Sequence, residues 1–561
     1  MPEPRRAELA VRGGTVVDGT GAAPFVGDVG ISGGVVVAIG DAVDGESEID
    51  ATGRLVTPGF IDIHTHYDPQ VLWDPGLTPS SWHGVTGVIA GNCGYSIAPT
   101  RPRDRSSLLR TLDKVEDMRV ATLEAGVAWD FETYPEYLDA VERRGVVINF
   151  GGYVGHTPVR LYVMGDEAYE RSATDDEIAR MRLIVAESIR GGAVGFSTDR
   201  AGFHLGDGGR PVPSVAATQE ETEALIRVVA EIGQGSVHVA AGEDYEWLYE
   251  LDLGRRINRS SILTYPAEAR SRRSHLEKLA HHEAKRRAGS EVSVQVSCRP
   301  IEQELKMDEP TAFYSMPAFA EFVSLPPEGR CRLYGDSGWR DRVQLDLDRS
   351  GTLKSRWNET RVVESPAHPD LLGRTIGAIA AERGSSPFEA LCQLAIEDQM
   401  QTRVRITFAN DDIEAVTKLL QGDGCILGLS DAGAHVSQIC DAVMPTDFLA
   451  NWVRDREVMT IEHGIRKLTG EIADLLDLDR GYIRLGAPAD VVILDYERLS
   501  PGPIRRVHDF PADGERLIAD EPMGIDCVLV NGVPIRRDGV PTPDGLDRRP
   551  GTILRTSRRA Q

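Results

Sequence analysis

The stretch Pro58–His66 reads PGFIDIHTH, an apolar run that ends in two histidines separated by one residue. Side chains alternate between the two faces of an extended chain, so Asp62, His64 and His66 are expected to point to the same side. On its own, such a histidine pair is as consistent with an ordinary strand end as with a functional site. The rest of the chain has to distinguish these two interpretations.

Composition narrows the class of protein. The chain has 561 residues, 41% of them hydrophobic, and no window approaches the about 18 uninterrupted apolar residues of a membrane span. The net charge of −25 would repel a phosphate backbone, so nucleic acid is not expected as a partner. Seven scattered cysteines are too few for a disulfide scaffold, and the N-terminus lacks the apolar segment of a secretory signal. We therefore expect a cytoplasmic protein with reduced thiols and no membrane contact.

The middle of the chain alternates strand-like and helix-like segments, which is the pattern of a parallel α/β fold. Eight is the number of strands that a closed (β/α)8 TIM-like barrel needs. The candidate strands are 60–66, 84–91, 146–150, 193–198, 236–240, 260–265, 292–297 and 425–431. A further apolar segment, 404–408, is interpreted as an accessory strand, because the residues around Asp431 look more like the end of a functional strand.

Gly-rich turns between short Val/Ile runs indicate β-structure at both ends of the chain. Residues 1–56 and 485–561 are predicted to form one small β-sandwich domain, and residues 57–484 are predicted to form the barrel. Within the barrel, residues 300–370 break the alternation with mixed proline, aromatic and charged residues. We interpret this segment as an insertion over one end of the barrel and as a candidate lid.

Two helix starts are predicted from capping-box patterns, which pair Thr174 with Glu177 and Thr218 with Glu221. After Thr218, apolar side chains recur on one helical face, as expected of a helix that packs against a sheet.

Polar residues cluster where the predicted strands end, and in barrels of this kind the working residues lie at the carboxyl ends of strands. They are His64, His66, Asn92, Cys93, His156, Ser197, Thr198, Asp199, His238 and Asp431. Zinc prefers imidazole, thiolate and carboxylate ligands, and ligands from separate strands can build a catalytic centre with an open position. This recurrence, rather than the histidine pair alone, favours a metal centre.

Three segments carry a family resemblance: TPGFIDIHTHYD (57–68), GVTGVIAGNCGYSIAP (84–99) and LGLSDAGAH (427–435). In this order, the chain resembles the amidohydrolase superfamily, in its D-aminoacylase or N-acyl-D-amino-acid deacylase branch. The resemblance covers nearly the whole chain and implies a metal-dependent barrel with a split β-sandwich. The GNCG element is specific to this branch, which uses a cysteine where many amidohydrolases use a carboxylated lysine to bridge two metals.

The resemblance assigns metal-related roles to five residues. His64 and His66 would hold one metal position. Cys93 would be a thiolate ligand to the tighter position or would bridge both, and His238 would be the fifth-strand ligand. Asp431 would contact the metal and act as the catalytic proton-transfer group. The implied cofactor is Zn²⁺, as one or two ions per chain.

The sixth predicted strand departs from the family pattern. Deacylases typically end this strand in a His-Leu-Lys element, whose histidine completes the tight metal site and whose lysine binds the substrate carboxylate. This chain reads SSILTYPAEARS there, so metal stoichiometry and carboxylate recognition are both open. The candidates for substrate binding are His156, Tyr265, Arg200 and Arg299, with Arg160 as a further arginine. Each of them also has an ordinary structural explanation.

The expected function is hydrolysis of a non-peptide amide C–N bond in an N-acyl-D-amino acid by a zinc-activated water, with Asp431 moving the proton. A cyclic or otherwise specialised amide is the alternative substrate, which the missing His-Leu-Lys element favours. A catalytically inactive barrel with a binding role is the third interpretation, and five potential ligands at strand ends argue against it. The expected partner is a small-molecule amide substrate, and a homo-oligomer is compatible with the sequence.

Overall fold

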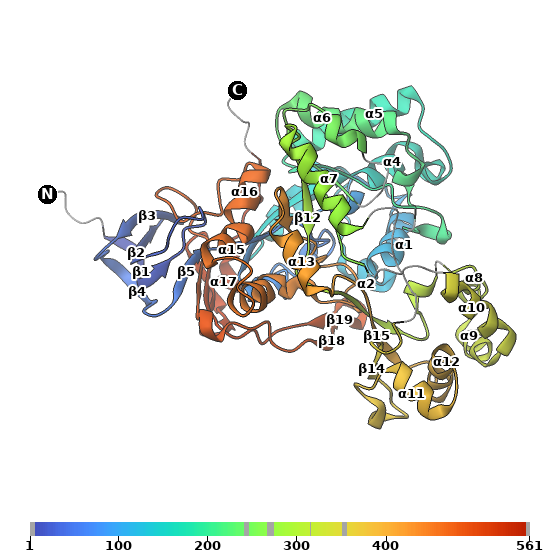
Figure 1. Ribbon diagram of the computed structural model, residues 1–561. Helices are drawn as coiled ribbons and strands as arrows, with labels where there is room; N and C mark the ends of the chain where they lie inside the picture. Colours follow the sequence, from blue (N-terminus) through green and yellow to red (C-terminus); the bar gives the residue numbers. More distant parts are fainter. Residues whose placement is uncertain are drawn as a thin grey trace.

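Eight parallel strands form the central sheet of the protein in the computed structural model (Figure 1). The structure describes residues 6–202, 204–240, 246–265, 274–314, 316–349 and 356–556. In chain order the strands are β6 (Phe60–Asp62), β7 (Val85–Ala90), β8 (Asn149–Gly155), β9 (Gly195–Thr198), β10 (Ser236–Val239), β11 (Ile257–Arg259), β12 (Val292–Val296) and β16 (Cys425–Leu427). A parallel bridge between Thr65 and Ala432, just beyond β6 and β16, joins the two ends of this sheet. The predicted α/β barrel is confirmed.

The predicted position of the sixth strand, 260–265, was wrong. The observed strand β11 ends at Arg259 and pairs with β10 on one side and β12 on the other. Val239, the last residue of β10, pairs with Arg259. Beyond Arg259, single backbone hydrogen bonds join the segment to its neighbours, from Ser260 to Val239 and from Ile262 to Gln295, and the strand does not continue, although its β-branched residues favour an extended conformation.

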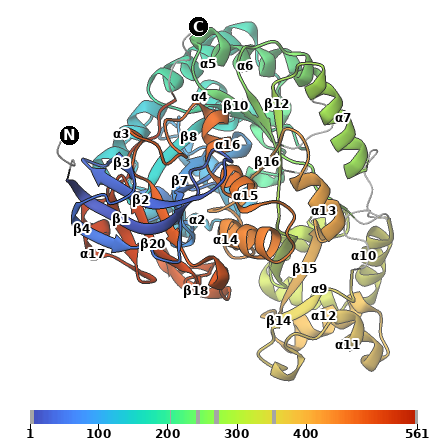
Figure 2. The same ribbon diagram turned by 60° about the vertical axis from the view of Figure 1, so that its left-hand side comes forward.

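Helices surround the sheet, and α4 to α7 lie along its outer side (Figure 2). The helices of this part are α1 (Arg105–Glu116), α2 (Val120–Gly126), α3 (Tyr134–Arg144), α4 (His156–Met164), α5 (Asp175–Arg190), α6 (Gln219–Ile232), α7 (His275–Arg287), α13 (Ile413–Leu420), α14 (Met444–Asp447), α15 (Ile461–Leu468) and α16 (Gly470–Leu476). Both predicted helix starts are confirmed, because Thr174 and Thr218 accept hydrogen bonds from the backbone N–H groups of Glu177 and Glu221. No helix among the described residues is both long and apolar enough to cross a membrane.

Strands from both ends of the chain share a second, nine-stranded sheet, which lies beside the barrel (Figure 1). These strands are β1 (Ala7–Val16), β2 (Phe25–Ser32), β3 (Val35–Gly40), β4 (Gly45–Asp50), β5 (Leu55–Pro58), β17 (Val491–Leu494), β20 (Ile525–Val530), β21 (Val533–Arg537) and β22 (Val540–Pro541), followed by helix α17 (Pro543–Arg548). The sheet forks at β1, which pairs with β2, β4 and β5. It has a separate apolar core that includes Val11, Val29 and Val491. The domain boundaries near residues 57 and 485 stay a prediction.

The insertion after β12 forms a small subdomain that projects from the barrel (Figure 1). It contains an antiparallel sheet and five helices among its described residues: β13 (Ile301–Lys306), α8 (Phe319–Val323), α9 (Pro327–Gly335), α10 (Ser337–Arg349), β14 (Arg361–Glu364), α11 (Ile376–Arg383), α12 (Pro387–Glu397) and β15 (Arg403–Ala409). The accessory strand expected at 404–408 is β15. Arg403 anchors the insertion through a buried ion pair with Glu515, in the hairpin of β18 (Arg505–Phe510) and β19 (Gly514–Ile518), at 2.7 Å. The lid role stays a prediction, and Ser315 and residues 350–355 lie outside the described residues.

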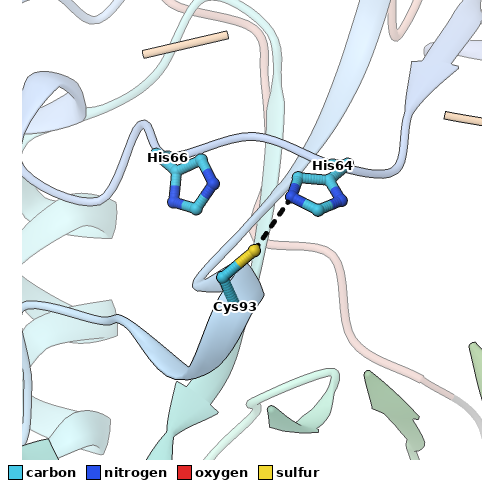
Figure 3. Close-up of side chains that lie close together, drawn as sticks. All are labelled: His64, His66 and Cys93. Carbon is cyan, nitrogen blue, oxygen red and sulfur yellow. Dashed lines mark hydrogen bonds between the residues drawn. The ribbon is translucent and has the colours of Figure 1, made fainter. Parts of the chain in front are cut away.

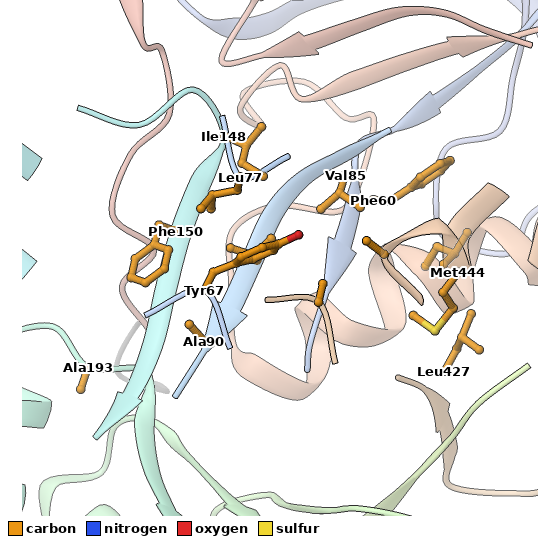
Figure 4. Packing of buried hydrophobic residues seen from close by; sticks show 14 of the residues in the cluster. Phe60, Tyr67, Leu77, Val85, Ala90, Ile148, Phe150, Ala193, Leu427 and Met444 are labelled. Carbon is orange, nitrogen blue, oxygen red and sulfur yellow. The ribbon is translucent and has the colours of Figure 1, made fainter. Parts of the chain in front are cut away.

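The barrel core is continuous from strand to strand. Figure 4 shows Phe60, Val85, Phe150 and Leu427, from β6, β7, β8 and β16, packed in one cluster with Met444. Burial of these side chains fixes the strands and leaves the strand ends free to carry polar groups.

The orientation of α5 and α6 can be tested with one matched pair of substitutions. Leu225 on α6 is fully buried, whereas Leu183 on α5 is 70% exposed. We expect Leu225→Ala to lower the free energy of unfolding by about 2 to 5 kcal/mol, because it leaves a cavity. Leu183→Ala should change it by less than about 0.5 kcal/mol. Urea denaturation followed by circular dichroism measures both, and equal losses would contradict the observed packing.

Candidate metal centre

The carboxyl end of β6 presents the two histidines of the PGFIDIHTH motif. His64 and His66 are buried, and their ring centroids lie 5.4 Å apart. Asp62 holds this segment in place, because its carboxylate accepts hydrogen bonds from the His64 backbone N–H at 3.2 Å and from the Ser430 hydroxyl at 2.6 Å. Burial raises the pKa of Asp62 to about 6. Asp62 is thus a scaffold residue, and the two histidines form the functional end of the strand.

Cys93 reaches the histidines through a strained turn. It lies in the short 3-10 helix η3 (Asn92–Gly94) with a φ of 54°, a left-handed conformation that is costly for a residue other than glycine. Gly91, directly before this turn, has a φ of 72°, and a Cβ at this position would lie 2.2 Å from the backbone oxygen of Tyr153. The first glycine of the GNCG element is therefore required by the backbone geometry that delivers the thiol.

Side chains from three loops converge at one point. The Nε2 of His64 lies 3.3 Å from the Sγ of Cys93 and 3.1 Å from the Oδ1 of Asp431. The Nε2 of His66 lies 3.7 Å from the same Asp431 oxygen. Figure 3 shows both imidazole rings and the Cys93 sulfur turned toward the space between them. Within the part of the chain that the structure describes, His64, His66 and Cys93 are the group of potential metal ligands, with ligand atoms all within 4.8 Å of one another.

Buried acids give this centre a strongly negative environment. Burial, followed by the charges of Asp431, Glu116 and Asp199, raises the pKa of the Cys93 thiol well above its usual value. Burial and the Asp431 charge also raise the pKa of Glu116 well above its usual value. Burial acts in the same direction on Asp431, but the two neighbouring histidines outweigh it and hold the pKa of that carboxyl well below its usual range. A positive ion at this point would relieve the repulsion among these groups.

His238 on β10 lies beside this group rather than in it. Its Nδ1 accepts a hydrogen bond from the Cys93 backbone N–H at 3.2 Å, and its Nε2 lies 2.8 Å from the Ser260 hydroxyl. Ser260 directly follows β11, and its hydroxyl is also 3.4 Å from the Nδ1 of His64. A serine that bridges two histidines therefore occupies the end of the sixth strand. The ligand role of His238 stays a prediction.

His156 is enclosed by protein on both sides. Its Nδ1 lies 2.8 Å from the Thr198 hydroxyl and its Nε2 lies 3.1 Å from Glu221, and all three side chains are buried. Arg160 pairs with the same Glu221 carboxylate. Glu221 thus turns inward from the first turn of α6 and links that helix to α4, instead of completing the predicted capping box.

The remaining substrate-binding candidates lie outside the group of His64, His66 and Cys93. Arg299 is ion-paired with Asp441 at 3.0 Å and with Asp447 at 3.2 Å. Arg200 is half-buried, and Tyr265 is 36% exposed. The segments 241–245 and 266–273, which follow the fifth strand and the expected sixth strand, lie outside the described residues.

Three residues that touch the histidines were not found from the sequence: Ser260, Glu116 and Gln295. The Oε1 of Glu116 lies 3.2 Å from the Nδ1 of His66, and the Oε1 of Gln295 lies 2.5 Å from the Nδ1 of His64. The sequence could have identified Gln295, because an amide side chain is unusual within a short apolar strand that is buried on both faces. No sequence pattern identifies Glu116, since only the folded position of α1 brings it to His66.

Comparisons with known proteins find one family model and several relatives that cover most of the chain. The model of the amidohydrolase family matches residues 47–536. An uncharacterized protein of Mycobacterium tuberculosis is 30% identical over 525 residues, which cover 87% of this chain and 84% of the relative. The D-aminoacylase of Alcaligenes xylosoxydans is 28% identical and covers 94% of this chain and 94% of its own length. The N-acyl-D-glutamate deacylase of the same organism is 29% identical, with 98% of this chain and 97% of its own covered.

Solved structures are similar over the whole length. An N-acyl-D-glutamate deacylase from Bordetella bronchiseptica, complexed with zinc and a phosphonate that mimics the tetrahedral intermediate, has a TM-score of 0.68 and 26% identity. A D-aminoacylase with a binuclear metal centre has a TM-score of 0.67 and 25% identity. In both comparisons 98% of this chain and 100% of the solved chain are covered.

Glu221 should make stability depend on acid pH. Burial raises the pKa of Glu221, but His156 and Arg160 lower it to about 2. A carboxyl with a lowered pKa stabilises the folded state above its unfolded pKa of about 4.3, and this contribution is lost as the pH falls toward 2. We expect Glu221→Gln to cost about 3 to 5 kcal/mol at pH 7, since Arg160 loses its buried partner.

The difference between wild type and Glu221→Gln should narrow as the pH falls from 4.5 toward 2, because the wild-type carboxyl is then protonated as well. Urea midpoints at pH 7 and at pH 3 measure this change. Glu223→Gln, on the same helix but half-exposed, is the control and should change stability by less than about 0.5 kcal/mol. A difference that is independent of pH would contradict the assigned ion pair.

Proposed function

Because the chain belongs to the amidohydrolase family, we propose that it is a metal-dependent deacylase that hydrolyses the amide bond of N-acyl-D-amino acids. The observation that carries this proposal is the convergence of His64, His66, Cys93 and Asp431 beyond the carboxyl ends of barrel strands. Relatives with D-aminoacylase and N-acyl-D-glutamate deacylase activity support the substrate class, since their similarity extends over nearly the whole chain.

The donor set fits zinc. Imidazole nitrogen, thiolate sulfur and carboxylate oxygen are its usual ligands, and catalytic sites keep one position open for water or substrate. The buried acids around Cys93 supply negative charge that a divalent cation balances. The zinc complex of the solved N-acyl-D-glutamate deacylase supports the same metal here. We assign one zinc ion to His64, His66 and Cys93, with Asp431 close enough to contact it as the proton-transfer group, and a second ion that also uses His238 is the alternative.

Asp431 is the group that moves the proton. When bound, zinc supplies a Lewis acid that polarises a carbonyl and makes water nucleophilic at neutral pH. The Asp431 side chain is 25% exposed and lies 3.1 Å from the Nε2 of His64, so it can reach both the centre and a substrate. Its carboxylate takes a proton from water and returns it to the leaving nitrogen, which would otherwise depart as a strongly basic amide anion.

A cyclic amide is the second candidate substrate. One observation favours it: β11 and the residue after it end in Asn258, Arg259 and Ser260, without the histidine and lysine expected of a deacylase. This difference removes one expected metal ligand and the expected carboxylate contact without changing His64, His66 or Cys93, so it bears on metal stoichiometry and on substrate choice.

The redox state of the cysteines indicates in which cellular compartment the protein works. All seven cysteines are free, and reduced thiols are the rule in the cytoplasm. We therefore propose a cytoplasmic enzyme, and a homo-oligomer stays a prediction.

Zinc binding tests the metal assignment. We expect Cys93→Ser to lower the affinity for zinc by more than about 100-fold, because loss of a direct ligand exceeds the 10- to 100-fold effect of outer contacts. Cys331→Ser, in helix α9 of the insertion, changes another partly exposed cysteine and should leave the affinity unchanged. Elemental analysis and competition with a chelator measure content and affinity. Zinc-free wild-type protein, or equal binding by the two variants, would sink the metal assignment.

Turnover on a substrate panel tests the reaction. The panel contains N-acetyl-D-amino acids, their L-enantiomers and cyclic imides, and we expect turnover of the D-series. Asp431→Asn should lower kcat by about 10² to 10⁴ because it removes the proton-transfer group. Turnover of cyclic imides alone would establish the second candidate, and zinc-loaded protein that turns over no member of the panel would favour a binding role.

A further inference from the structure

One ring nitrogen of each histidine in the candidate centre lies beside a buried side-chain oxygen from another element. The Nδ1 of His64 lies 2.5 Å from the Oε1 of Gln295 on β12. The Nδ1 of His66 lies 3.2 Å from the Oε1 of Glu116, the last residue of α1. Gln295 is fully buried and Glu116 is 4% exposed, so water does not readily replace either oxygen in its contact with the histidine.

These contacts determine which nitrogen of each ring carries the proton. The Oε1 of Gln295 can only accept a hydrogen bond, so the Nδ1 of His64 must donate to it, and the Oε1 of Glu116 lies where the Nδ1 of His66 can donate in the same way. With Nδ1 protonated, the Nε2 of each neutral ring would hold the lone pair that binds a metal ion. The two Nε2 atoms lie 3.1 Å and 3.7 Å from the same Asp431 oxygen, which is where the metal ligands converge.

Both Gln295 and Glu116 lie at positions where a polar or charged side chain is expected to lower the stability of the fold. Gln295 is a polar residue in a buried strand, and its Nε2 has no hydrogen-bond partner within the described residues. Glu116 is a carboxylate at the C-terminal end of α1, the end at which the helix dipole disfavours negative charge. Within the described ranges, its carboxyl group contacts the imidazole of His66. Both side chains thus lie in costly positions that are explained by the histidines they contact.

We propose that Gln295 and Glu116 are positioning residues that fix the tautomers and ring orientations of His64 and His66, so that both offer Nε2 to one metal ion. The proposal rests on the metal-dependent function proposed above. Acceptors of this kind typically contribute 10- to 100-fold to metal affinity. They act through the histidines and do not touch the substrate.

The test compares variants that remove the acceptor with variants that keep it. Gln295→Met and Glu116→Met remove it at similar length, whereas Gln295→Glu and Glu116→Gln keep a carbonyl oxygen. We expect the two Met variants to lose about 10- to 100-fold in zinc affinity, measured by chelator competition on metal-stripped protein. The variants that keep the oxygen should retain most of the affinity. Gln303→Met on β13 of the insertion is the control and should bind zinc like the wild type.

Equal affinity in all variants, or equal loss in the Met variants and the oxygen-keeping variants, would overturn the proposal. A second measurement needs no substitution of Gln295 or Glu116. A long-range ¹H–¹⁵N spectrum of wild-type protein with ¹⁵N-labelled histidine reports the tautomer of each ring. The His66 signals are assigned by their loss in His66→Gln. Protonated Nδ1 atoms are expected, and protonated Nε2 atoms would overturn it. Failure of the wild type itself to bind zinc would instead contradict the proposed function.

Discussion

The parallel bridge between Thr65 and Ala432 is the constraint on which the candidate site depends. It joins the two ends of the eight-stranded sheet, and the backbone N–H of His66 donates to the Ala432 carbonyl at 2.8 Å in the same contact. Because the bridge fixes the first strand against the last, His64 and Asp431 can share a 3.1 Å contact although they are far apart in the sequence. Closure of the barrel and the position of the centre therefore depend on the same contact.

Three residues in the loops around the site have strained backbones. Cys93, Asp431 and His435 have φ angles of 54°, 48° and 47°, in the left-handed region that residues with a Cβ rarely adopt. Such conformations persist only where the surrounding structure holds them, and they are typical of functional sites. The barrel strands and the Thr65–Ala432 bridge supply that support, so the thiol and the carboxylate are already oriented by the protein scaffold.

What the sequence predicts here is what depends on local pattern. Alternation along the first strand identifies His64 and His66, and the spacing of Thr218 and Glu221 identifies the start of α6. The segment 260–265 was misplaced, because its β-branched residues do not reveal where the neighbouring strands end. The contacts of Glu116 and Gln295 with the histidines depend on packing between distant elements, for which no local pattern exists. The turn around Cys93 was found by motif, whereas its strained geometry required the structure.

The order in which the chain is synthesised determines when the nine-stranded sheet can form. Strand β5 pairs with β17, so Val56 finds its partner Ile493 only after most of the polypeptide has left the ribosome. At elongation rates of about 5 to 20 residues per second, that interval is roughly 20 to 90 s. β1, β2 and β3 can pair at once, because they are adjacent in the sequence. The edge that awaits β17 meanwhile exposes unpaired backbone groups, which makes it a site where other nascent chains can pair.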